Sequence, residues 1–158
     1  NGLDTDEFAP VELSTRDPFR LITTASADVP LKGLDYSLKA LEQLKKEFPK
    51  IHLIVIGKMK EGGHTQRLIQ KLNISDSVFF KSNLSKNDIK HLYSTSSIAI
   101  VSSLYEGFGY PVIEAMSCQV PLIATNVSSI PELTLDHATL ISPKDANAIE
   151  KNVKEIFR

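Results

Sequence analysis

The chain has 158 residues, of which 42% are hydrophobic and 23% are charged, and its formal net charge at pH 7 is −1. This composition indicates one soluble globular domain and excludes a disordered chain or a broad basic surface for nucleic acid. No apolar run approaches the roughly 20 residues that span a bilayer, and the polar, acidic amino end is unlike a signal peptide. Cys118 is the single cysteine, so no internal disulfide can form and a reducing, cytoplasmic compartment is expected.

The hydrophobic pattern alternates between strand and helix periods along the chain. In chain order it predicts a strand at Phe19–Ser26, a helix at 34–48, a strand at Ile51–Gly57, a helix at His64–Asn73, a strand at Ser77–Phe80, a helix after Ser85, a strand at Ser97–Ser103, a helix from Pro111, a strand at Val120–Thr125, a turn at Pro131, a strand at Ala138–Ser142 and a helix through Ile149, Val153 and Ile156. The pattern predicts one α/β domain, a doubly wound, Rossmann-like parallel six-stranded sheet with helices on both faces. Ligands of such sheets bind beyond the carboxyl ends of the strands, so the strand-to-helix loops are the segments that matter for function.

The segment EGFGYPVIEAM, Glu106–Met116, follows the strand predicted to end at Ser103 and opens the next helix. Pro111 suits the first helical turn, where its missing N–H has no helical partner to lose. Gly107 and Gly109 are expected to let the backbone turn sharply and approach a ligand closely. Together with the helix amino terminus, their amides predict a binding site for a phosphate or diphosphate.

The two glutamates of this segment have two interpretations. Glu114, one turn into the helix, is an acceptor that suits the two hydroxyls of a ribose, and Glu106 suits a sugar hydroxyl or positive charge developing at a sugar carbon. Alternatively, Glu114 only complements the helix dipole and Glu106 is a solvated loop residue. The residues by themselves leave both interpretations open.

The stretch SLYEGFGYPVIEAMSCQVPLIATNVSSIPEL resembles the signature of retaining glycosyltransferases with the GT-B fold (glycosyl transferases group 1, family 4). The donor-binding domain of that family carries two glutamates with seven residues between them. NGLDTDEFAP resembles the segment that enters this domain, PLKG its phosphate-binding loop and LIVIG its second strand. The resemblance runs from Asn1 to about Pro143 and implies that residues 1–158 form the carboxyl-terminal half of a GT-B fold, with residues 1–18 as the interdomain segment.

The resemblance also implies the parts of a donor site. Glu106 would contact the transferred sugar, and Glu114 would bind the ribose of the nucleotide. The backbone amides lining the sugar and the phosphates would be those of Gly107, Phe108, Gly109 and Tyr110. The base would lie against the backbone near Phe80 and Lys81, and Gly57 would approach the donor at the end of its strand.

Lys32, in the loop SADVPLKG, is expected to neutralise the diphosphate as it leaves, although a solvated surface lysine is the alternative. The family usually has Gly-Arg-Leu before the Lys-Gly pair, whereas this chain has Ser26, Ala27 and Asp28, so that Ala27 stands in place of the arginine. A bidentate phosphate partner is thereby lost, and Asp28 adds a negative charge nearby. Three outcomes remain open: compensation by a neighbour such as Lys58, a different handling of the donor, or weakened catalysis.

Smaller departures from the family pattern occur around the glutamate segment. Ser102-Ser103 replaces the usual Pro-Ser, Gln119 replaces a frequent glycine, and Ser128-Ser129 replaces a glycine pair. The last of these changes is expected to bear on which sugar fits.

The expected function is binding of a UDP-sugar or GDP-sugar as the donor domain of a retaining hexosyltransferase. The diphosphate would depart through an oxocarbenium-like state, and a hydroxyl of an acceptor sugar or lipid-linked glycan would attack on the same face. No cofactor or metal is expected, because the helix terminus and the lysine carry the charge and the four histidines have no metal-ligand spacing. GT-B enzymes place the acceptor site on an amino-terminal domain that is absent from this chain. The isolated chain is therefore expected to bind donor weakly and to transfer little, and any peripheral attachment to the inner membrane face would belong to that other domain.

Two other functions remain open. A catalytically degenerate module, marked by Ala27, would hold a nucleotide sugar without transferring it. A flavodoxin-like or receiver-like signalling domain has the same architecture, but it would need a flavin loop or a clustered acidic pocket at the strand ends, and neither is evident.

Overall fold

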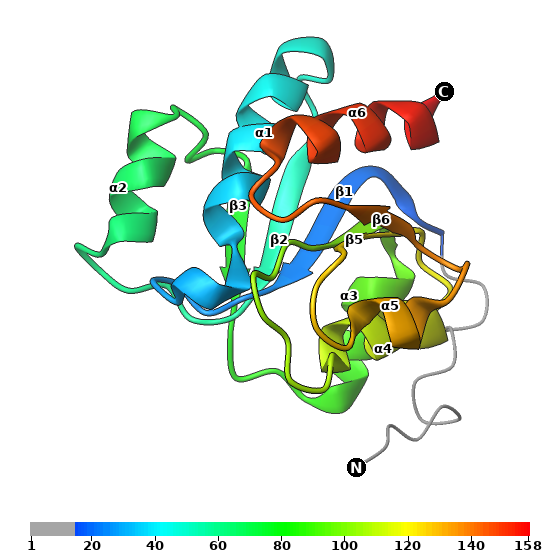
Figure 1. Cartoon of the computed structure of the whole chain (residues 1–158). Helices are drawn as coiled ribbons and strands as arrows, with labels where there is room; N and C mark the ends of the chain where they lie inside the picture. The colour runs from blue at the N-terminus through cyan, green and yellow to red at the C-terminus, as the bar shows by residue number, and fades with distance from the viewer. Residues whose placement is uncertain (1–14) are drawn as a thin grey trace.

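The computed structural model describes residues 15–158 (Figure 1). The strands are β1 (Asp17–Thr24), β2 (His52–Ile56), β3 (Val78–Lys81), β4 (Ser96–Val101), β5 (Leu122–Thr125) and β6 (Thr139–Ile141). The helices are α1 (Leu34–Glu47), α2 (His64–Lys71), α3 (Lys86–Ser94), α4 (Tyr110–Ser117), α5 (Ile130–Thr134) and α6 (Ala146–Phe157), and a 3₁₀ turn, η1 (Pro30–Lys32), precedes α1. The interdomain role expected for residues 1–18 lies mostly outside the described residues, and Asp17 and Pro18 belong to β1.

The strands form one parallel sheet in the order β3-β2-β1-β4-β5-β6, as the doubly wound prediction requires. Helices α1, α2 and α6 pack on one face of the sheet, and α3, α4 and α5 pack on the other (Figure 1). Strands β1 and β4 are neighbours at the centre, although β2 and β3 lie between them in the chain. The chain direction across the sheet reverses at this point, so the helices that follow β1 and β4 lie on opposite faces of the sheet.

The central strands are buried on both faces, which explains their nearly continuous apolar sequences. Side chains of β4 alternate between two apolar clusters: Ile98 and Ile100 pack on the α1 side, and Ala99 and Val101 pack on the α4 side. This double coverage makes the centre of the sheet a rigid support for the loops that leave it.

The predicted elements differ from the structure at a few local points. The strand expected to reach Ser103 ends at Val101, because the backbone beyond it turns away and Leu104 N–H donates to the carbonyl of Leu31 (2.8 Å). The expected turn at Pro131 is the short helix α5, since proline in a first helical turn is pre-organised for helix. The turn η1 was not predicted, whereas the helix expected after Ser85 is present and begins with a capping box formed by Ser85 and Asp88.

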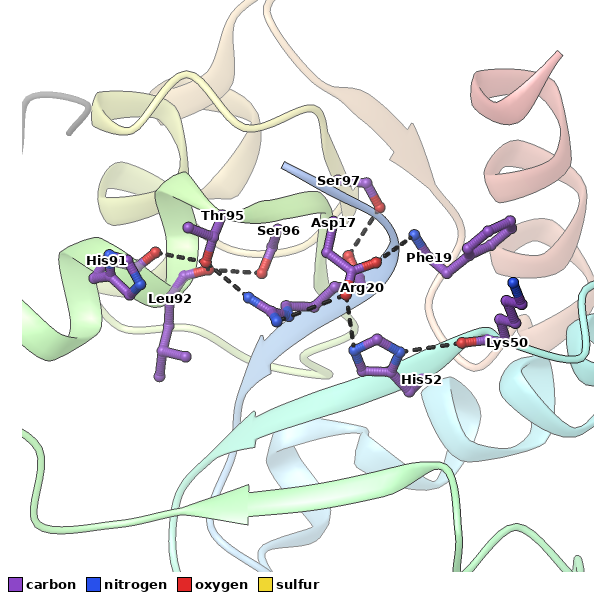
Figure 2. Close-up of polar contacts among 10 residues, drawn as sticks. All are labelled: Asp17, Phe19, Arg20, Lys50, His52, His91, Leu92, Thr95, Ser96 and Ser97. Atoms are coloured by element: carbon purple, nitrogen blue, oxygen red, sulfur yellow. Dashed lines mark hydrogen bonds and ion pairs between the residues drawn. The ribbon is translucent and has the colours of Figure 1, made fainter. Parts of the chain in front are cut away.

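A polar network at the amino-terminal edge of the sheet fastens the start of β1 to its neighbours (Figure 2). Arg20 donates to Thr95 Oγ1 (2.8 Å), and Ser97 Oγ donates to the Arg20 carbonyl (2.8 Å). Asp17 Oδ2 lies 3.6 Å from both Arg20 Nη2 and His52 Nε2. These groups bond to one another at the edge opposite the strand-to-helix loops, so they serve strand pairing.

Candidate functional site

The loops after β1 and β4 meet at the carboxyl-terminal edge of the sheet. Ser102 Oγ donates to the Gly33 carbonyl (2.9 Å), and Leu104 N–H donates to the Leu31 carbonyl (2.8 Å). Gly33 has φ +63°, and a Cβ at this position would stand 1.9 Å from the Ser102 carbonyl oxygen. Glycine is therefore required for the two loops to approach so closely.

Lys32 and Glu106, the two residues expected to be catalytic, form an ion pair that joins these two loops. Lys32 ends η1, and its Nζ lies 2.9 Å from Glu106 Oε2. The same carboxylate oxygen accepts a hydrogen bond from Ser103 Oγ (3.1 Å). Glu106 is only 8% exposed, so the interpretation of this residue as a solvated loop glutamate is wrong. The fold brings together two opposite charges that are 74 positions apart in the sequence.

The two serines that replace the family's glycine pair contact the backbone of Glu106. Glu106 N–H donates to Ser128 Oγ (3.4 Å), and Ser129 Oγ donates to the Glu106 carbonyl (3.3 Å). Ser128 has φ +50°, a left-handed conformation that costs a non-glycine residue about 1 kcal/mol. The departure at these positions therefore places two hydroxyl groups within the candidate site, where they help to set the position of Glu106.

The start of α4 depends on one of the two glycines before it. Gly109 has φ +88°, and a Cβ there would lie 2.5 Å from Leu133 Cδ1. Pro111 occupies the first turn of α4, as predicted. Gly107 has no positive φ in this range, and a Cβ there would meet no atom within 4 Å. The backbone bends at Gly107 as expected, but of the two glycines it is Gly109 whose backbone conformation requires glycine.

Aromatic side chains border the β4–α4 loop. The rings of Phe108 and Tyr110 lie 4.8 Å apart between centroids, with an interplanar angle of 48°. Tyr105 and Tyr110 are both exposed, and Leu31 is exposed on the neighbouring loop. Exposed apolar and aromatic side chains therefore lie on the same two loops that carry the Lys32–Glu106 pair.

Glu114 lies in the second turn of α4, and the first turn holds no acidic residue. The structure therefore does not favour the interpretation that Glu114 complements the helix dipole. Burial raises the pKa of Glu114 to about 7, and a hydrogen bond with the Tyr93 hydroxyl acts in the opposite direction. The buried Tyr93 hydroxyl also lies 3.0 Å from Thr24 Oγ1, at the end of β1. Sequence analysis missed Tyr93 and Thr24, because no local pattern signals a contact between residues 69 positions apart.

The residues expected near the base lie at the ends of β2 and β3. Gly57 N–H donates to the Lys81 carbonyl (2.8 Å), which extends the pairing of the two strands by one residue. The half-buried Phe80 side chain packs against the core cluster on the α1 side. These positions share the carboxyl-terminal sheet edge with Lys32 and Glu106.

Two charged residues, Asp28 and Lys58, lie next to Ala27. The Asp28 carboxylate accepts hydrogen bonds from the amides of Thr65 (2.7 Å) and His64 (3.2 Å), and the Thr65 bond contributes most to lowering the Asp28 pKa. The negative charge expected beside the phosphate loop therefore caps α2. Ala27 N–H donates to the Lys58 carbonyl (3.1 Å), so the exposed Lys58 is next to the position of the missing arginine.

Other classes of site were sought among residues 15–158. This part of the chain contains no group of three or more His, Cys, Asp or Glu residues that could hold a metal ion. None of its helices has the length and apolar character needed to cross a membrane. Cys118 is buried.

The raised pKa of Glu114 predicts a pH dependence of stability. An ordinary glutamate has a pKa of 4.5 and the folded chain raises it to about 7, so between these values the folded chain keeps a proton that the unfolded chain has lost. This contribution to stability is complete below the unfolded pKa and is lost as pH rises towards the folded pKa. Relative to Glu114→Gln, the wild type should lose up to about 1.4 kcal/mol of unfolding free energy per pH unit from about pH 5 to about pH 7. Urea denaturation of both proteins across this range measures the difference, and parallel stability curves would contradict the assignment.

Comparison with known proteins identifies the family. The sequence model described as "Glycosyl transferases group 1" matches residues 6–158. MMP alpha-(1->4)-mannosyltransferase of Mycolicibacterium hassiacum is 37% identical over 151 residues, which make up 94% of this chain and 36% of that protein. O-antigen chain mannosyltransferase B of Escherichia coli is 41% identical over 66 residues, 42% of this chain and 17% of that protein. The chain thus spans only a fraction of the length of these curated relatives.

Solved structures of low sequence identity share the fold. The carboxyl-terminal domain of the glycosyl transferase group 1 family protein LpcC from Francisella tularensis superposes with a TM-score of 0.82 at 23% identity, covering 98% of this chain and 87% of that chain. A glycosyltransferase from Rickettsia africae superposes with a TM-score of 0.82 at 25% identity, covering 99% of this chain and 45% of that chain. The chain therefore belongs to the glycosyl transferases group 1 family and has the fold of a GT-B carboxyl-terminal domain.

Proposed function

We propose that this chain is the donor-binding domain of a retaining glycosyltransferase and that it holds a nucleotide diphosphate sugar where the loops after β1 and β4 meet. The observation that carries the proposal is the Lys32–Glu106 pair, 2.9 Å apart at the point where the strand order reverses. Doubly wound sheets bind their ligands at this point. The cation suits a diphosphate, and the carboxylate suits a sugar hydroxyl.

The proposed chemistry follows from where charge grows. When the diphosphate leaves, negative charge accumulates on it, and Lys32 together with the amides at residues 107–110 would stabilise that charge without a resident metal. The Lys32 side chain is 31% exposed, so its ammonium can turn to a ligand while Ser103 still holds Glu106. Glu106 would then face the sugar, whose anomeric carbon becomes positive. An acceptor hydroxyl would attack on the face that the diphosphate leaves.

Mannose is the sugar, and GDP the nucleotide, that we propose to test first. The two curated relatives described above are named as mannosyltransferases. A third, from Mycolicibacterium smegmatis, is named as a GDP-mannose-dependent alpha-(1-6)-phosphatidylinositol monomannoside mannosyltransferase and is 26% identical over 99% of this chain. These names support GDP-mannose over a UDP-sugar, and an acceptor that is a sugar or a lipid-linked glycan. We assign the acceptor site to a separate domain, which is where GT-B enzymes place it.

Calorimetric titration of the chain with GDP, UDP and ADP tests the donor site. We expect selective binding of GDP that is lost in Lys32→Ala and in Glu114→Ala, and that is kept in Lys50→Ala, a lysine before β2 at the other edge of the sheet. Binding of none of the three nucleotides, or equal binding by all variants, would contradict the proposal. Sugar transfer by the chain joined to an acceptor domain then separates an active enzyme from the degenerate module that Ala27 suggests.

Gly107→Ala should separate ligand binding from folding. Because a Cβ at Gly107 meets no atom within 4 Å, the variant should keep its unfolding free energy within about 0.5 kcal/mol of wild type. The added methyl group would stand over the loop where the phosphates are proposed to approach, so GDP affinity should fall roughly ten-fold. Urea denaturation and calorimetry measure the two effects. If the variant is as stable as wild type and binds GDP equally well, the Gly107 amide does not belong to the proposed site.

A further inference from the structure

We infer that Ser103 and Thr125 are positioning residues for Glu106, and that together they hold one oxygen of its carboxylate so that the other oxygen receives a hydroxyl of the transferred sugar. This inference rests on the proposed function and deepens it. It concerns two buried hydroxyl groups at the carboxyl ends of neighbouring strands. Thr125 is the last residue of β5, and Ser103 lies two residues after the end of β4.

The two oxygens of the Glu106 carboxylate have different surroundings. Oε2 accepts a hydrogen bond from Ser103 Oγ (3.1 Å) and lies 2.9 Å from Lys32 Nζ. Within residues 15–158, Oε1 has no hydrogen-bond partner. It still reaches the surface, because the fully buried side-chain nitrogen or oxygen that lacks a partner in this range is Arg20 Nε. Oε1 is therefore the oxygen that remains open to a ligand hydroxyl.

Ser103 is better placed than Lys32 to maintain this arrangement. The Lys32 side chain is 31% exposed and is proposed to turn towards the diphosphate, so its hold on Glu106 would weaken when a donor binds. Ser103 is 2% exposed, and its hydroxyl has one hydrogen, which it donates to the carboxylate. With a donor bound, Ser103 would thus keep Oε2 in place while Oε1 accepts from a sugar hydroxyl.

The buried Thr125 in turn fixes the peptide group that follows Ser103. Thr125 Oγ1 donates to the Ser103 carbonyl (2.6 Å), and the N–H of the same peptide group, that of Leu104, donates to the Leu31 carbonyl (2.8 Å). Because β4 has already ended at Val101, the Thr125 hydroxyl supplies a bond that the strand ladder no longer gives. The peptide plane is held from both sides, which limits the directions open to the Ser103 side chain.

This arrangement predicts an effect on the sugar of the donor and not on its nucleotide. Oε1 would contact the sugar, which GDP lacks, whereas the diphosphate would meet Lys32 and the loop amides. Without the Ser103 hydroxyl, the Glu106 carboxylate could rotate and would present Oε1 to the sugar for only part of the time. The loss of affinity should therefore fall on GDP-mannose.

Calorimetric titration of wild type and Ser103→Ala with GDP and GDP-mannose tests the inference. We expect Ser103→Ala to bind GDP-mannose roughly ten-fold more weakly than wild type and to bind GDP within about two-fold of wild type. Ser96→Ala is the matched control, because it removes a buried hydroxyl at the opposite end of β4, where Ser96 Oγ donates to the Leu92 carbonyl (2.7 Å). This control should bind both ligands as wild type does.

A double-mutant cycle with Glu106→Ala separates positioning from packing. Glu106→Ala should still bind GDP-mannose through the nucleotide, and adding Ser103→Ala should weaken that binding no further, because Ser103 acts through the carboxylate. Thr125→Val should lower GDP-mannose affinity by a smaller factor than Ser103→Ala, since the Ser103 hydroxyl is still present. Thr125→Ser keeps the hydroxyl and should bind GDP-mannose as wild type does.

Three results would overturn the inference and leave the donor site intact. The first is equal loss of GDP and GDP-mannose affinity in Ser103→Ala, or a loss that persists in the Glu106→Ala background, which would assign Ser103 to packing. The second is wild-type GDP-mannose affinity in Ser103→Ala beside a loss in Glu106→Ala. The third, which decides if Ser103→Ala does not fold, is equal GDP-mannose affinity of Thr125→Val and Thr125→Ser. Failure of wild type to bind GDP, UDP or ADP would instead overturn the proposed function, and the inference with it.

Discussion

Replacing Lys32 by methionine should weaken binding of GDP by about a hundred-fold and lower the unfolding free energy by about 1–3 kcal/mol. Methionine keeps most of the aliphatic stem and removes the ammonium that would meet the diphosphate. It also leaves the 8% exposed Glu106 without its cation, 2.9 Å away in wild type. Among residues 15–158, the Ser103 hydroxyl would then be the remaining hydrogen-bond donor to this buried carboxylate, which is costly, so stability and affinity should fall together.

Three further variants show whether these losses come from the site. Lys50→Met removes the same charge near the opposite sheet edge and should leave GDP affinity unchanged. The double variant Lys32→Met/Glu106→Gln should regain stability, because the unpaired charge is gone, without regaining affinity. Lys58→Met should also weaken binding if Lys58 compensates for the arginine that Ala27 replaces. Calorimetry measures the GDP affinities and urea denaturation measures the unfolding free energies. Unchanged GDP affinity in Lys32→Met would show that Lys32 does not belong to the site.

Replacing Gly33 by alanine should cost about 3 kcal/mol or more of stability and also abolish donor binding. The new Cβ would stand 1.9 Å from the Ser102 carbonyl oxygen, a backbone atom that cannot turn aside as a flexible side chain can. Alanine at φ +63° is strained in addition. The β1–α1 loop can relieve the overlap only by moving away from the end of β4, which would separate Lys32 from Glu106.

Gly62→Ala is the matched control for this variant. Gly62 has φ +65°, but a Cβ there would meet no atom within 4 Å. The expected cost of Gly62→Ala is therefore the backbone strain without any overlap, about 1 kcal/mol. The difference between the two variants in urea denaturation isolates the overlap with Ser102. Equal stability of Gly33→Ala and Gly62→Ala would mean that the close approach of the two loops contributes little.

Most of the fold could be predicted from the sequence, because its signals are local. Apolar runs that fill both faces of β4 and the amphipathic stripe of α1 are visible within a few residues, and their alternation implies a parallel sheet. The glutamate segment was equally recognisable, since glycine and Pro111 have conformational preferences that do not depend on distant residues. What the sequence did not show was local geometry set by contacts elsewhere, such as η1, which ends at Lys32, and the end of β4 at Val101.

The candidate site shows the same division more sharply. The sequence by itself identified Lys32, Glu106 and Glu114 as chemically suitable residues, because charge and placement after a strand can be read directly. Only the tertiary structure showed that Lys32 and Glu106 are paired, that Glu106 is buried, and that the Tyr93 hydroxyl lies beside Thr24. Burial and pairing depend on which segments the sheet order places side by side, and a single sequence carries no local record of contacts between residues about 70 positions apart. The sequence therefore determined which groups are available to the site, and the packing of β1 against β4 determined how they are arranged.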